Sequence, residues 1–165
     1  MAESMKKIIN LMVNGEEFEL IVKNHWTLAF VLREKLGFTG LKVACSGGEC
    51  GACTIIMDGK ATASCLTLAV ECEGKTIETI ESLSKDLKNI HPLQTAWLEE
   101  YGAQCGFCSP GMIMGAKALL DENPNPGVEE IKEALSGNLC ICSNYDHIIK
   151  AVQRAAEIMV AEGGK

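Results

Sequence analysis

The sequence predicts an α+β fold in which a strand-rich first half is followed by a helical second half. Short β-prone runs joined by two-residue turns occupy the first half. In the second half, apolar residues recur at helical spacing. The nine cysteines divide in the same way, with four in each half and one left over. We therefore expect two domains, residues 1–82 and 83–165, with the boundary inside the segment 81–92.

The strands of the first half are predicted by turn residues and by side-chain alternation. Residues 7–22 form two β-prone runs around Asn14-Gly15, a pair that favours a two-residue hairpin turn. Residues 54–65 repeat this pattern around Asp58-Gly59. Residues 75–81 alternate between apolar and polar side chains, as expected for a last strand.

One helix is predicted between these strands, over residues 27–37. Thr27 can cap its start, and Gly37 can end it. Its apolar residues recur at helical spacing: Leu28, Val31, Leu32 and Leu36. Two hairpins, one helix and a last strand indicate a small sheet folded over one helix.

The second half is predicted to contain helices over residues 91–102, 109–123, 128–138 and 145–164. In the second of these, Ser109 can serve as the N-cap and Pro110 as the first helical residue, where its missing N–H costs little. The third is expected to end near Gly137. The last carries the clearest apolar stripe, made by Ile148, Ile149, Val152, Ala156 and Met159. Four short helices can pack as a small bundle.

Composition and charge exclude several classes of protein. The chain is 47% hydrophobic and carries a formal net charge of −7 without a Lys/Arg-rich run, which disfavours a nucleic-acid partner. The apolar stretch near the N-terminus is too short for a signal-peptide core, and no stretch approaches the length of a membrane span. We therefore expect a cytoplasmic protein, and in that reducing compartment grouped cysteines more often bind metal or carry out redox chemistry than form structural disulfides.

The four cysteines of the first half are Cys45, Cys50, Cys53 and Cys65. They follow the pattern C-x4-C-x2-C, then eleven residues, then C, which is the spacing of plant-type [2Fe–2S] ligands. A loop that wraps a cluster needs small residues that tolerate unusual backbone angles, and the intervening residues include Gly47, Gly48, Gly51 and Ala52. Zinc is the competing interpretation because C-x2-C is also a zinc half-site.

The four cysteines of the second half are Cys105, Cys108, Cys140 and Cys142. A C-x2-C pair and a C-x-C pair could hold zinc, a [2Fe–2S] cluster or a [4Fe–4S] cluster. A thioredoxin-like motif is less consistent because it requires a preceding strand, whereas helices are predicted on both sides. Both pairs lie at predicted helix N-termini, whose free N–H groups and positive dipole ends favour thiolates.

A resemblance to a known family extends along nearly the whole chain. The segments that carry it are "CSGGECGACTIIMDGK", "SCLTLA", "QCGFCSPGMIM" and "LSGNLCICSNY". They resemble the small iron–sulfur subunit of the molybdenum hydroxylases, the superfamily of xanthine dehydrogenase, aldehyde oxidoreductase and carbon monoxide dehydrogenase. The resemblance implies a plant-ferredoxin-like β-grasp domain followed by a four-helix-bundle domain, each holding one [2Fe–2S] cluster on the four cysteines of its half.

The resemblance also implies a role and partners. The chain would relay single electrons from a molybdopterin site on a large subunit, through the helical-domain cluster and then the β-grasp cluster, to FAD on a medium subunit of a heterotrimer. Gln104 matches a residue that hydrogen-bonds the pterin, and Cys142 lies on the same contact path. No substrate site is expected on this chain. The alternatives are a freestanding ferredoxin-like electron carrier and a zinc-bound structural module.

One segment departs from the family pattern. The family commonly has C-R-C-T-G-Y where this chain has residues 140–145, with Ile141 in place of the arginine and Asn144 in place of the glycine. We expect Asn144 to adopt the left-handed geometry of that glycine. Loss of the arginine charge should lower the reduction potential of the adjacent cluster or change a subunit contact. Ala44 and Ser109, where glycine and threonine are usual, are expected to matter little.

The remaining conspicuous residues have structural interpretations. Cys72 is expected to be a small buried or strand-edge residue, since both cysteine sets are complete without it. The three histidines share no ligand spacing and are expected in a loop, a turn and a helix; they are His25, His91 and His147. Met112 and Met114 are expected to pack in a helix core.

Overall fold

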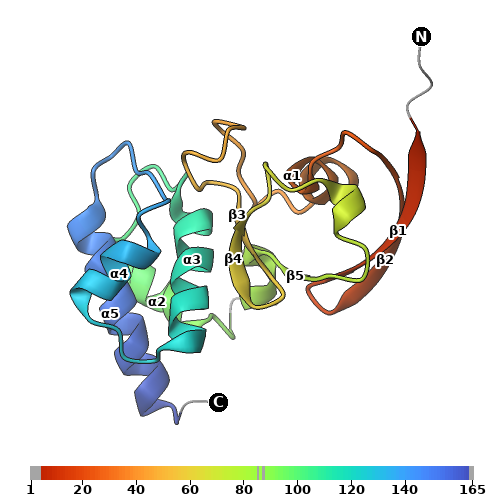
Figure 1. Cartoon of the computed structure of the whole chain (residues 1–165). Helices are drawn as coiled ribbons and strands as arrows, with labels where there is room; N and C mark the ends of the chain where they lie inside the picture. The colour runs from red at the N-terminus through yellow and green to blue at the C-terminus, as the bar shows by residue number, and fades with distance from the viewer. Residues whose placement is uncertain (1–4, 85, 87, 164–165) are drawn as a thin grey trace.

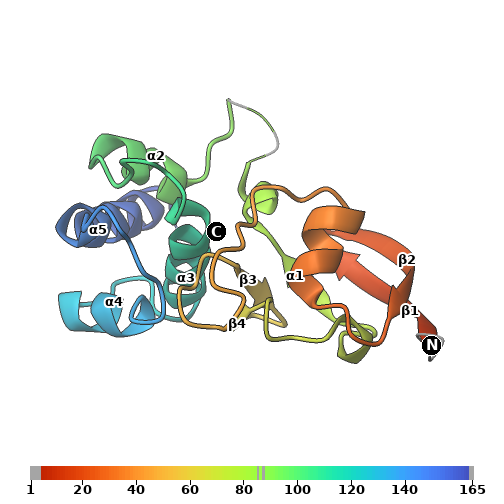
Figure 2. The same cartoon turned by 90° about the horizontal axis from the view of Figure 1, so that it is seen from above.

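The computed structural model describes residues 5–84, 86 and 88–163. A strand-rich half and a helical half lie side by side, with α3 at the junction between them (Figures 1 and 2). The predicted α+β class is confirmed. The outer limits of the predicted domains, residues 1 and 165, lie outside the described residues.

The strand half contains one mixed sheet in the order β2-β1-β5-β3-β4. Its strands are β1 (Lys6–Val13), β2 (Glu16–Lys23), β3 (Thr54–Met57), β4 (Lys60–Ala63) and β5 (Thr76–Glu78). The pairs β1–β2 and β3–β4 are antiparallel hairpins. Strand β5 joins them, because it pairs parallel with β1 and antiparallel with β3.

The two hairpin turns form where their sequences predicted them. Asn14 and Gly15 have φ angles of 53° and 83°, and Asp58 and Gly59 have 49° and 80°. Two successive residues with positive φ are typical of a type I′ turn, whose twist matches that of the flanking strands. Asp58 also ties its turn to β5, since its carboxylate accepts from the N–H of Thr76 at 3.0 Å.

The predicted helix after Thr27 forms, but its second turn is wider than an α-helix. Thr27 caps α1 (Leu28–Phe30) by accepting from the N–H of Phe30 at 3.2 Å. The chain continues as the π-helical segment η1 (Val31–Lys35), in which Leu36 donates its N–H to Val31. This helix packs against the sheet in one core that includes Ile9, Leu11, Leu28, Leu32 and Ile77.

The helical half contains α2 (Pro92–Glu99), α3 (Ser109–Glu122), α4 (Val128–Ala134) and α5 (Tyr145–Ala161). All four lie within their predicted segments, with three local differences. Ser109 is the first helical residue of α3 and Cys108 holds the N-cap position, so the prediction that Ser109 is the N-cap was wrong. Helix α4 ends at Ala134 rather than near Gly137, and β5 is shorter than predicted because the chain turns at Ile80 into a 3₁₀ segment.

The two halves meet where α3 packs on β3. Met112 and Met114 are buried in the core of the helical half, as predicted, and Ile56 of β3 belongs to the same core. Within the described part of the chain, no helix is long and apolar enough to span a bilayer.

Candidate metal centres

The first cysteine set gathers around the loop that leads from the strand-half helix into β3. Cys45 lies exposed at its start, whereas Cys53 and Cys65 are buried beneath it. Side-chain contacts join Cys45 to Cys50 and Cys53 to Cys65, and the charge of Cys45 also acts on Cys65. The loop therefore brings all four predicted ligands together.

Backbone N–H groups point at the sulfurs of this set. The N–H of Gly47 donates to the sulfur of Cys45 at 3.4 Å. That hydrogen bond and those from the Cys50 backbone and side chain lower the pKa of the Cys45 thiol to about 6. Burial, and then the contact with Cys53, raise the pKa of Cys65 to about 11. The loop thus stabilises negative charge at its outer sulfur and excludes water from its inner one.

The glycines of this loop provide room as well as flexibility. Gly48 has φ +79°, and a Cβ there would collide with the side chain of Leu66. Gly51 has φ +64°, and a Cβ there would meet the carbonyl of Gly137 and the side-chain amide of Asn138. Gly51 is therefore required both by its backbone angle and by close contact with the helical half.

The second cysteine set forms from two chain segments of the helical half. The sulfurs of Cys105 and Cys142 lie 3.6 Å apart. Cys108 contacts Cys140, and Cys140 in turn contacts Cys142. These contacts link the four thiols in sequence, although the two pairs are separated by α3 and α4 along the chain.

Burial and hydrogen bonds shift the pKa values of thiols in this set in different directions, as they do in the first set. Burial, followed by the contact with Cys140, raises the pKa of the Cys108 thiol to about 12. For Cys140 burial acts in the same direction, but hydrogen bonds from the Asn144 backbone and from Cys108 outweigh it and lower the pKa. The pKa of Cys142 is raised: the Cys105 backbone acts to lower it, but the Cys105 thiol and burial outweigh that effect.

Helix starts place this second set as the sequence predicted. Cys108 immediately precedes α3, and Cys142 lies just before Asn144, the N-cap residue of α5. Both helices therefore place the positive ends of their dipoles near the thiols, and the backbone N–H of Asn144 donates to the Cys140 sulfur.

The thiols are arranged in pairs rather than around one point. Within the described residues, no group of three or more His, Cys, Asp or Glu side chains surrounds the position of a single metal ion. In a [2Fe–2S] cluster held by four cysteines, each iron takes two thiolates and shares bridging sulfides. The two pairs of adjacent thiols in each half fit that donor requirement.

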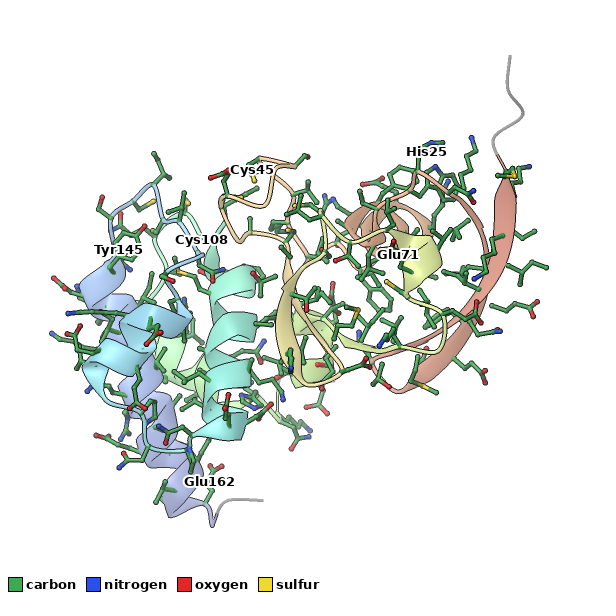
Figure 3. All side chains as sticks on the ribbon, in the orientation of Figure 1. His25, Cys45, Glu71, Cys108, Tyr145 and Glu162 are labelled. Atoms are coloured by element: carbon green, nitrogen blue, oxygen red, sulfur yellow. The ribbon has the colours of Figure 1, made fainter. Side chains whose placement is uncertain are left out.

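The two sets lie close together on one side of the molecule. In the view of Figure 3, Cys45, Cys108 and Tyr145 lie along the upper side, whereas Glu162 lies at the bottom. A cavity of about 470 Å³ is lined by Cys50 of the first set and by Cys105, Cys108 and Cys140 of the second. The backbone N–H of Leu139 donates to the carbonyl of Cys50 at 3.0 Å.

Asn138 strengthens the contact between the two loops. Its side chain is 6% exposed, and its Nδ2 donates to the carbonyl of Gly51 at 2.9 Å and to the hydroxyl of Thr54 at 3.3 Å. Sequence reasoning missed this residue, because its partners lie far away along the chain. A buried polar side chain in a loop between two cysteine pairs offers no signal beyond its position.

Gln104 lies on the surface beside Cys105, and its Nε2 donates to the Oδ1 of Asn144 at 3.4 Å. Asn144 itself has φ −87°, so the expectation that it adopts left-handed geometry was wrong. The preceding residue, Ser143, takes the positive angle instead, with φ +54°. Asn144 is free to extend its side chain toward the loop that carries Gln104.

The residues given structural interpretations lie as expected. Cys72 is fully buried in the strand-half core, and burial raises its pKa to about 11. His25 lies in a turn far from Cys108 (Figure 3), and His91 caps α2. His147 lies in the first turns of α5.

Two cluster-binding families match the two halves of the sequence. Residues 11–84 match the family described as "2Fe-2S iron-sulfur cluster binding domain". Residues 79–153 match the family described as "[2Fe-2S] binding domain". Each match contains one complete cysteine set.

Relatives are similar over almost the full length of the chain. The nicotine 6-hydroxylase small subunit of Paenarthrobacter nicotinovorans is 48% identical, with 87% of this chain and 86% of the relative covered. The nicotinate dehydrogenase small FeS subunit of Eubacterium barkeri is 47% identical, with 93% and 98% covered. A chain of quinoline 2-oxidoreductase from Pseudomonas putida 86 superimposes with a TM-score of 0.90 at 42% identity, with 97% and 99% covered. This chain therefore belongs to the family of small [2Fe–2S] iron–sulfur subunits of the molybdenum hydroxylases.

Proposed function

We propose that this chain is the electron-transfer subunit of a molybdenum-containing hydroxylase or dehydrogenase complex. It relays single electrons between a molybdopterin site on a large subunit and FAD on a medium subunit through two [2Fe–2S] clusters. The observation that carries this proposal is the presence of two complete cysteine sets, one in each half, on loops joined by a direct backbone hydrogen bond.

The ligand assignment follows the two sets. The first cluster is held by Cys45, Cys50, Cys53 and Cys65, and the second by Cys105, Cys108, Cys140 and Cys142. When bound, each cluster accepts and releases one electron. The chain's own contribution is to hold the thiolates, to donate N–H groups to their sulfurs, and to bury one side of each site, which together tune the reduction potential.

The finer fold follows from the same division. The strand half is a plant-ferredoxin-like β-grasp domain, residues 1–82, and the helical half is a four-helix-bundle domain, residues 83–165. Separate buried cores in the two halves support this division, as do two family matches that overlap only at residues 79–84. We place the protein in the cytoplasm because nine unbridged cysteines suit a reducing compartment.

The helical half faces the molybdopterin subunit. Gln104 and Cys105 are exposed there, so a group carried by a partner can approach them without a change of fold. We assign the Gln104 amide to hydrogen-bonding the pterin and Cys142 to the same contact path. The side chain of Ile141 is 93% exposed beside the second set, which suits a contact with an apolar partner surface.

The test is to purify the complex through this chain and count its metals. About four irons per chain, visible absorption and two distinct reduced-cluster EPR signals are expected. A large chain with molybdenum and a medium chain with FAD should co-purify. About two irons per chain, or zinc in place of iron, would refute the two-cluster relay. An iron-loaded chain that always behaves as an 18 kDa monomer would instead indicate a freestanding carrier.

A further inference from the structure

The end of α2 and the segment that follows it are held by a series of polar bonds from α5 and its N-cap residue. The guanidinium Nε of Arg154 donates to the carboxylate of Glu99 at 3.0 Å. The Nδ1 of His147 lies 2.8 Å from the carbonyl oxygen of Glu100. Asn144 provides the last bonds of this series, those nearest the second cysteine set.

Asn144 makes two hydrogen bonds that together determine which way round the side-chain amide of Gln104 faces. Its Nδ2 donates to the carbonyl oxygen of Tyr101 at 2.8 Å, and a carbonyl can only accept. The Oδ1 of Asn144 must therefore face Gln104, and Gln104 must present its Nε2 to that oxygen at 3.4 Å. The Oε1 of Gln104 is left to accept a hydrogen bond from outside the chain.

Asn144 is buried and fixed in position, whereas Gln104 is exposed to solvent. Asn144 is 6% exposed and stands at the N-cap of α5, so its own position is fixed by the helix. Gln104 and Cys105 are exposed, and Cys105 contacts Cys142. The carbonyl that Asn144 holds belongs to Tyr101, a non-glycine residue with φ +54°, at the sharp bend after α2.

We propose that Asn144 is a positioning residue that orients the Gln104 amide toward the molybdenum pterin of the partner subunit. It fixes the bend at Tyr101 and selects the amide orientation in which the Gln104 oxygen faces outward. A glycine at this position would make neither bond. The inference rests on the proposed function, since it requires that Gln104 contact the pterin.

The test uses Asn144→Asp and Asn144→Gly in the purified complex. Aspartate has nearly the same shape and is favoured at a helix N-cap, so α5 should persist, but it cannot donate to the Tyr101 carbonyl. Its carboxylate can still accept from the Gln104 Nε2, so Asn144→Asp breaks only the Tyr101 bond, whereas Asn144→Gly breaks both. We expect molybdenum loss on mild heating to be about fivefold faster in Asn144→Asp than in the unaltered complex, as expected for one hydrogen bond, and faster still in Asn144→Gly. Metal analysis after gel filtration measures this rate. The matched control is Asn125→Gly, in the exposed loop after α3, which should change nothing.

Two further variants separate positioning from a general structural role. Gln104→Ala should lose molybdenum at the same raised rate, and combining it with Asn144→Gly should add no further effect, because the second residue acts through the first. The cluster EPR signals should stay unchanged in all variants. An unaltered rate in Asn144→Gly, or effects that multiply in the double variant, would overturn the inference. If Gln104→Ala retains molybdenum normally, the inference and the pterin contact both fail, whereas four irons and a co-purified large subunit would leave the relay intact.

Discussion

Replacing Gly111 with alanine should destabilise the protein, although alanine is the better helix former. Gly111 lies in the first turn of α3, where the helix crosses the first cysteine loop. A Cβ there would collide with the carbonyl oxygen of Gly51 and lie 3.2 Å from the Cα and carbonyl carbon of Ala52. These are backbone atoms that cannot rotate away, so helix and loop must separate by about 1 Å to reach ordinary contact.

The expected magnitude is a balance of two opposing effects. Forcing an extra carbon into a packed contact costs about 1–3 kcal/mol, and the upper part of that range applies because backbone must move. Replacing glycine by alanine inside a helix returns about 1 kcal/mol. The net loss is about 1–2 kcal/mol, which corresponds to a melting temperature lower by roughly 2–8 °C in a chain of this size.

The first assay follows the visible absorption of the clusters during heating. The second is EPR of the protein with both clusters reduced, in which the magnetic coupling between the clusters should weaken as the helix and the loop separate. Gly115→Ala, one turn further along α3, is the matched control. Its Cβ would lie 3.2 Å from the Leu135 side chain, which can move, so its effect should stay within about 1 kcal/mol of zero. If Gly111→Ala melts at or above the temperature of Gly115→Ala with unchanged coupling, the close contact between α3 and the loop is refuted.

Three further predictions concern single side chains. His91 is an N-cap whose Nδ1 accepts the Leu93 N–H at 3.1 Å, and burial lowers its pKa. Because the folded state therefore binds fewer protons than the unfolded state, stability should fall as pH drops below about 6.5. His91→Asn keeps a capping side chain and should reduce the fall in melting temperature between pH 7 and pH 5. An unchanged slope would mean that another group causes the pH dependence. Tyr145→Phe removes the hydroxyl that accepts the Cys140 N–H at 2.9 Å. The freed N–H can donate to a cluster sulfur instead, which should raise the potential of the second cluster by on the order of 40 mV. Tyr101→Phe, at a residue that is 76% exposed, should leave the potential unchanged, and equal potentials in the two variants would contradict this reasoning. In cluster-free protein at pH 7, iodoacetamide should modify Cys45 well before Cys65, because the pKa values of these thiols are about 6 and about 11. Mass spectrometry measures the two rates, and equal rates would refute the stabilisation of the Cys45 thiolate by backbone N–H groups.

Local signals were sufficient to predict the hairpins and helices and to divide the cysteines into two sets. Asn14-Gly15 and Asp58-Gly59 predicted both hairpins because positive φ at two successive residues is a property of those residues alone. The cysteine spacing grouped the eight candidate ligands correctly by half, although their ligand role stays a prediction. The family resemblance is confirmed, and it alone led to the prediction of partner subunits, which no cysteine spacing could indicate.

Features that depend on distant neighbours could not be predicted. The parallel pairing of β5 with β1 joins residues more than sixty positions apart through two residue pairs. Asn138 bonds to Gly51 across 87 positions, and nothing local marks it. Asn144 was misjudged because the positive backbone angle moved to Ser143, a choice made by the start of α5 and its contacts.

The strand order has a consequence for how the protein is made. Strand β5 fills the place between the two hairpins and contributes only three residues to the sheet. During synthesis it leaves the ribosome after all four cysteines of its half, so these thiols are present before β5 can join the two hairpins. Iron delivered before that moment would meet two unjoined hairpins, and we expect the chain to accept its first cluster only once β5 has docked.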